Sequence, residues 1–85
     1  MEHKDYIKHY AGSVEDLTEE LGNLRYDTLT NFLEMLAAKL ERDSNKNVAK
    51  ERLKLAEHLK DAHQCIKEAS WNIAKAWVVA EPYEE

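Results

Sequence analysis

Three residue types that bind metals or carry protons recur at helical spacing in the second half of the chain: His58, Asp61 and Cys65. Steps of three, four and seven residues nearly return to one face of an α-helix, so these side chains would share a face. Zinc ligands lie about 2 Å from the ion, whereas seven residues of helix rise about 10 Å. His58 and Cys65 therefore cannot easily share one ion, and we expect no metal and no cofactor.

A second pair with chemical potential is Arg52 and His58, which have five residues between them. This spacing resembles the Arg-x(4-6)-His motif of the HEPN family of helical ribonucleases, at those two positions only. The resemblance implies RNA cleavage at a composite site across a dimer, where the arginine and the histidine converge on the scissile phosphate. The chain departs from the motif at Leu53, where a polar residue is usual.

Other catalytic patterns are missing from the sequence. It has no Gly-rich phosphate loop, no Cys-x-x-Cys pair, and no Glu-x-x-His of the helical di-iron proteins. These absences favour an interaction protein over an enzyme. A ligand pocket or hydrolytic site formed by Arg52, His58, Asp61 or His63 at a helix seam stays open as an alternative, since these residues have either a packing role or a place in such a pocket.

The composition favours one helical, soluble domain spanning residues 1–85. Charged residues make up 34% of the chain, which contains only two glycines and one proline. The longest apolar run covers five residues, 76–80, whereas a membrane span needs about 20. Cys65 is the single cysteine and no apolar leader precedes the first charged residues, so we expect a cytoplasmic protein that does not cross a membrane.

The charge is unevenly distributed. The net charge is −5, which argues against general nucleic-acid binding. The segment 39–54 nevertheless carries six basic and three acidic residues, or +3. Contact of this basic segment with nucleic acid or another acidic partner is therefore a further alternative.

Two long helices would position these residues. Apolar residues recur at three- and four-residue steps from Val14 to Leu40, and Ser13 is a suitable N-cap, which predicts a helix over 13–42. Gly22 lies inside this pattern as a mild weak point rather than a break. The short polar residues of 43–47 predict the turn, and a second helix over 47–81 ends before Pro82. A short helix over 3–11 precedes this antiparallel hairpin, and a tail over 82–85 follows it.

A seven-residue repeat of apolar residues runs along the second long helix. One hairpin cannot bury all of its apolar surface, so the sequence predicts an all-α homodimer, a four-helix bundle built from two hairpins, with a monomeric three-helix arrangement as the alternative. The residues of the repeat that we assign to the dimer seam are Leu59, Ala62, Ile66, Ala69, Ile73 and Ala76.

Aromatic residues give the most specific indication of a further partner. In the predicted hairpin, the N-terminal segment lies beside the end of the second helix, and aromatic side chains are favoured anchors in protein interfaces. The residues expected at this aromatic end are Tyr10, Trp71, Trp77 and Tyr83. We therefore expect a small adaptor or regulator that acts by protein–protein binding.

Overall fold

The computed structural model describes residues 3–83, and these contain three α-helices and no strand. The helices are α1 (Val14–Gly22), α2 (Tyr26–Ala49) and α3 (Leu53–Ala80), and the short 3₁₀ helix η1 (Glu81–Tyr83) follows α3. The all-α prediction is confirmed. Residues 84 and 85 of the expected tail lie outside the described residues.

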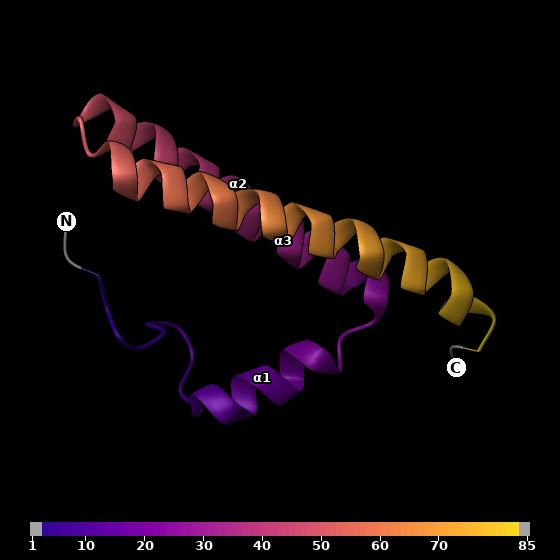
Figure 1. Cartoon of the computed structure of the whole chain (residues 1–85). Coiled ribbons are helices and arrows are strands. Elements are labelled where there is room, and N and C mark those ends of the chain that lie inside the picture. The colour runs from indigo at the N-terminus through magenta and orange to yellow at the C-terminus, as the bar shows by residue number, and fades with distance from the viewer. Residues whose placement is uncertain (1–2, 84–85) are drawn as a thin grey trace.

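α2 and α3 form a long antiparallel hairpin (Figure 1). The chain extends over 49 × 30 × 14 Å and has a radius of gyration of 15.4 Å. A compact chain of this length would have a radius of gyration of about 12 Å. The molecule is therefore elongated and flat, with much of its side-chain surface outside any core.

The predicted turn at 43–47 is wrong, because the chain reverses at 50–52. Glu51 has a φ of 61° there, and the N–H of Arg52 donates to the carbonyl of Asn47 at 2.8 Å. The short polar side chains upstream find partners that keep them helical. Ser44 Oγ donates to the carbonyl of Ala56 at 2.7 Å, and Asn47 Nδ2 donates to the carbonyl of Asp43 at 2.8 Å.

The predicted helix over 13–42 is also wrong, because residues 23–25 interrupt it. Ser13 caps α1 as expected, since its Oγ accepts from the N–H of Asp16 at 3.1 Å. α1 ends at Gly22, and α2 starts at Tyr26 without a side-chain hydrogen bond from its N-cap residue Arg25. The Asp27 carboxylate accepts a hydrogen bond from the backbone N–H of Thr28, and two more from the Arg25 guanidinium at 2.7 and 2.9 Å. This ion pair fixes the first turn of α2.

The expected short helix over 3–11 does not form. Residues 5–9 contain only bends and a turn, in which the N–H of Tyr10 donates to the carbonyl of Ile7 at 3.2 Å. The apolar spacing of Tyr6, Ile7 and Tyr10 is helical, but an isolated helix this short is marginal in water, and α1, which is equally short, begins with the capping Ser13.

Candidate interaction surfaces

Small and polar residues at seven-residue intervals make the contact between α2 and α3. Steps of seven return to one face of each helix, and small side chains let the two backbones approach closely. We call this set the small-residue seam. It comprises all residues classed as buried within 3–83: Thr30, Ala37 and Ser44 of α2, and Ala56, His63 and Ser70 of α3. Only the two alanines are apolar, so the seam supplies little hydrophobic stabilisation.

Hydrogen bonds satisfy the polar members of the seam. Ser44 Oγ donates to Ala56, as described, and His63 Nδ1 lies 2.8 Å from the carbonyl of Ala37. A carbonyl can only accept, so Nδ1 of His63 carries the proton. The hydroxyls of Thr30 and Ser70 donate to carbonyls of their own helices at 2.9 and 2.6 Å. No buried side-chain polar atom within 3–83 lacks a partner.

The large apolar side chains lie beside the seam instead of within it. An α-helix turns by about 100° per residue, so a residue that lies one or four positions before a seam residue, or three positions after it, falls on the same side of the seam. Each helix therefore carries one stripe of such positions. In an antiparallel pair, the stripes of the two helices lie on one side of the hairpin. We call this surface the apolar flank; it contains Leu29, Leu33, Leu36 and Leu40 of α2, and Leu55, Leu59, Ala62, Ile66, Ala69, Ile73 and Ala76 of α3.

The apolar flank includes every residue that the sequence assigned to a dimer seam. Leu59, Ala62, Ile66, Ile73 and Ala76 are half-buried, and Ala69 is exposed. Within one chain they do not form the closest helix contact, because Ala56, His63 and Ser70 take that position. The flank thus remains partly open along the hairpin.

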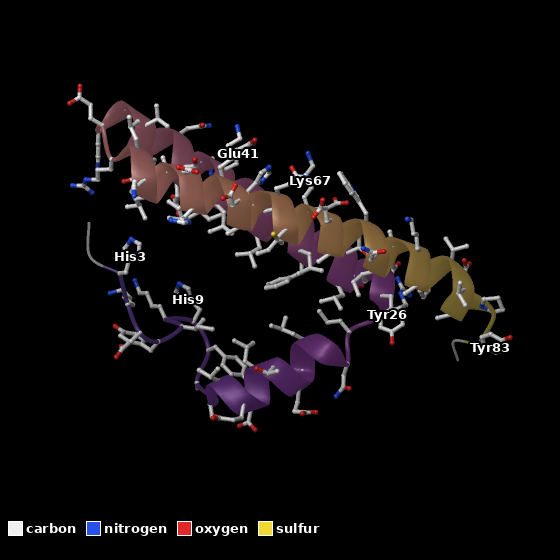
Figure 2. All side chains as sticks on the ribbon, in the orientation of Figure 1. His3, His9, Tyr26, Glu41, Lys67 and Tyr83 are labelled. Atoms are coloured by element: carbon white, nitrogen blue, oxygen red, sulfur yellow. The ribbon has the colours of Figure 1, made fainter. Side chains whose placement is uncertain are left out.

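The opposite side of the hairpin carries charged residues near the middle of both helices. Figure 2 shows Glu41 and Lys67 on the side turned away from α1. They border a hollow of about 160 Å³ together with Glu34 and His63, and His63 Nε2 lies 3.6 Å from Glu41 Oε2. His58 and Asp61 are exposed, and Arg52 borders a different hollow at the turn. The structure therefore does not gather the four residues of the alternative pocket, which are Arg52, His58, Asp61 and His63, into one site.

α1 stands on the side of the apolar flank, opposite Glu41 and Lys67 (Figure 2). None of its residues is buried; Leu17 and Leu21 are half-buried, and Val14 is 62% exposed. A Cβ added at Gly22 would meet no atom within 4 Å. α1 therefore lies over the flank without closing onto it.

The four aromatic residues predicted at one end of the hairpin are separated. Tyr10 lies in the N-terminal segment and donates from its hydroxyl to Glu20, which raises the pKa of Tyr10. This segment and the C-terminal end occupy opposite ends of the molecule (Figure 1). Trp71 is 51% exposed, with Lys67 Nζ 6.0 Å from its ring centroid. Trp77 is half-buried, and Tyr83 of η1 is 83% exposed.

Trp77 continues the small-residue seam by another seven residues. The Arg25 guanidinium lies 5.5 Å from its ring centroid, a favourable cation–π geometry. Because Arg25 also pairs with Asp27, these three residues hold the start of α2 against the last turns of α3. Trp77 thus has a packing role in the hairpin.

A basic hollow lies at the turn. Its volume is about 110 Å³, and it is lined by His3, Asp43, Lys46, Asn47, Lys50, Arg52, Leu55 and Leu59. Asp43 is its one carboxylate. A hydrogen bond from Lys39 Nζ at 2.6 Å lowers the pKa of Asp43, and the charges of Lys46 and His3 lower it further. The remaining ionisable groups give the hollow a positive potential.

Within residues 3–83, no three histidine, cysteine or carboxylate side chains are grouped as a metal site. In the same part of the chain, no helix combines the length and apolar character needed to cross a bilayer. No protein-family model, curated protein or solved structure matches the chain. The features that bear on function are therefore the small-residue seam, the apolar flank and the opposite side of the hairpin.

Proposed function

We propose that the chain is a protein–protein interaction module that acts as a homodimer, in which two hairpins pair through their apolar flanks to form a four-helix bundle. The observation that carries this proposal is that no large apolar side chain is among the buried residues of 3–83. A chain of 85 residues with two alanines as its buried apolar core has little hydrophobic stabilisation of its own.

The exposed area supports a partner on the flank. The accessible surface is 7026 Å², whereas a compact monomer of this mass exposes about 5,200 Å². The difference of about 1,800 Å² is more than the 800 Å² or so that each partner buries in a standard interface. A second copy covering the flank would therefore remove enough surface to form a stable dimer.

The shape and charge of the hairpin favour a second copy in antiparallel orientation. The flank extends along both helices, so a two-fold axis can pair it with itself. Ala62, Ala69 and Ala76 alternate with larger residues, which allows close helix approach. A parallel pair would bring two +3 segments (39–54) together, whereas an antiparallel pair separates them.

In such a bundle, the opposite side of α3 remains available for another protein. Trp71 and Val78 each follow a seam position by one residue, which places them on the side away from the flank. Trp71 is 51% and Val78 70% exposed. We propose this pair, with Tyr83 beyond it, as the surface through which an adaptor or regulator would bind its partner. Tyr10 lies too far from this end to take part.

The thiol of Cys65 bears on location. Cys65 is exposed and forms no disulfide within the described residues. An oxidising compartment would couple such thiols between molecules, so we propose the reducing cytoplasm. Association measurements therefore need a reductant, so that a disulfide-linked pair is not mistaken for the bundle.

The dimer is tested by sedimentation equilibrium of the full chain from nanomolar to high micromolar concentration. We expect a dimer for the parent chain, a monomer for Ile66→Asp on the flank, and a dimer for the control Gln64→Asp on the opposite side. Both variants add one negative charge to the middle of α3, but only Ile66→Asp removes an apolar side chain from the flank. A parent chain that stays monomeric throughout, or an Ile66→Asp chain that dimerises like the control, would contradict the proposal.

The basic hollow at the turn favours a second candidate function, contact with an acidic ligand or nucleic acid. Lys46, Lys50 and Arg52 are gathered there with His3. Such binding depends steeply on salt, because each phosphate contact releases counterions. RNA binding that does not weaken between low and physiological salt would exclude this function.

A further inference from the structure

We propose that α1 is a hinged cover of the apolar flank, which lies over the flank in the single chain and is displaced when a second copy binds. This inference rests on the proposed function, because it takes the flank as the dimer surface. It adds that the chain carries its own competitor for that surface, so the affinity of the dimer is set partly by α1.

The composition of α1 suits a cover. Val14, Leu17 and Leu21 follow each other at steps of three and four residues, which places them on one face of the helix. α1 stands on the side of the flank (Figure 2). Leu17 and Leu21 are half-buried, and Leu17 borders a hollow with Tyr6, Ile7 and Tyr10 of the N-terminal segment. Leu33 and Leu40 of the flank are half-buried as well. A partly exposed apolar face of α1 therefore stands on the same side of the hairpin as the partly exposed flank.

α1 is attached to the hairpin through its two flanking segments, the link over 23–25 and the N-terminal segment, whose His3 borders the hollow at the turn. Within the described residues, no hydrogen bond or ion pair joins α1 to α2 or α3. Arg25 fixes the start of α2 through Asp27 and Trp77. Residues 22–26 border an open hollow with Ala80 and Tyr83. The link over 23–25 is therefore anchored to the hairpin at Arg25, and the N–H groups of Asn23 and Leu24 donate to carbonyls of the last turn of α1.

α1 and a second hairpin cannot cover the flank at the same time. The area of flank that each one covers decides which of them occupies it at a given protein concentration. α1 has nine residues, whereas the hairpin helices have 24 and 28. A second hairpin would cover more of the flank than α1 can, but it must be supplied from solution. The cover therefore prevails at low concentration and the second copy at high concentration.

The test weakens the cover without changing the flank. In the full chain, Leu17→Ser/Leu21→Ser removes two of the three apolar residues on the face of α1, and the control Glu15→Ser/Glu19→Ser changes its opposite face. We expect the dimer dissociation constant of the leucine variant to fall about tenfold, since two half-buried leucines no longer compete. The control is expected to stay within about twofold of the parent, measured at high salt to suppress its charge change. A raised dissociation constant would show that α1 belongs to the dimer interface, and an unchanged one would show that it is not a cover.

A second measurement separates this inference from the dimer itself. If the parent and all variants remain monomeric, the proposed function fails, and binding of the fluorescent dye ANS to the monomers then tests the cover. We expect more dye fluorescence from Leu17→Ser/Leu21→Ser than from the parent or the control, because the flank is uncovered. Equal fluorescence from all three chains would overturn the cover as well.

Discussion

His63 reaches across the hairpin to Ala37: its Nδ1 lies 2.8 Å from the backbone carbonyl of that residue. The histidine is 7% exposed and the alanine 2%. This bond joins positions 26 residues apart at the middle of both helices. It sets the register of α2 against α3 at a point where small side chains provide little other specificity.

Loss of this bond is expected to destabilise the hairpin. His63→Ala removes the hydrogen bond to the carbonyl of Ala37 and opens a void in the seam, at a cost of about 2–3 kcal/mol of unfolding free energy. The exposed His58→Ala is the matched control and should stay within about 0.5 kcal/mol of the parent. Urea unfolding followed by circular dichroism at fixed protein concentration measures both. Equal midpoints for the two variants would contradict the role of His63.

The closeness of the seam is tested at Ser44. This residue is 2% exposed and its hydroxyl donates to Ala56. Ser44→Val both removes the bond and adds volume, so we expect a loss of about 2–3 kcal/mol, whereas Ser44→Ala should lose only about 1 kcal/mol. Thermal unfolding of the two variants beside the parent gives the order. A valine variant as stable as the alanine variant would mean that the seam has room to spare.

Gly22→Ala is expected to strengthen α1. Gly22 lies at the end of α1 without a positive φ, and an added Cβ meets open space. Alanine is favoured over glycine in a helix by about 0.5–1 kcal/mol, so the helical signal should rise. The contrasting variant is Gly12→Ala, whose Cβ would lie 2.8 Å from the Tyr10 ring and would displace it. Circular dichroism that falls for Gly22→Ala would contradict this expectation.

The ion pair of Lys39 and Asp43 predicts a pH dependence. The hydrogen bond from Lys39 lowers the pKa of Asp43 below its ordinary value. A carboxylate with a lowered folded-state pKa stabilises the native state above its unfolded pKa, and this contribution is lost as the pH falls through the folded pKa. In Lys39→Gln the pKa of Asp43 should rise, and the stability of the variant should equal that of the parent only at acid pH. NMR titration of the Asp43 carboxyl group measures the change; an unmoved pKa would show that Lys39 is not its partner in solution.

The sequence predicted the all-α class because apolar spacing and helix-forming residues pointed the same way. It misplaced the turn because Ser44 and Asn47 have side chains typical of turns, while Glu51, which takes up the positive φ, is not a residue type that indicates one. The break at 23–25 has only a weak signal in the sequence, because a single glycine such as Gly22 is tolerated inside a helix at a modest cost.

The candidate surfaces were only partly predictable for a related reason. The apolar repeat at Leu59, Ile66 and Ile73 is visible in the sequence, and it lies on the flank. The closest contact between α2 and α3 uses the repeat of Ala56, His63 and Ser70. These side chains are small or polar and make hydrogen bonds, so a pattern of apolar residues does not reveal this repeat. The seven-residue spacing of Thr30, Ala37 and Ser44, matched in the second helix, is the signal that would have found it.

The small-residue seam separates the positions that specify the hairpin from the positions that would select its companion. Apolar side chains on the flank can be exchanged for one another without changing how Ala37 meets His63. Substitutions on the flank would therefore change which chains associate. The fold of each chain would stay the same, because it depends on the six residues of the small-residue seam.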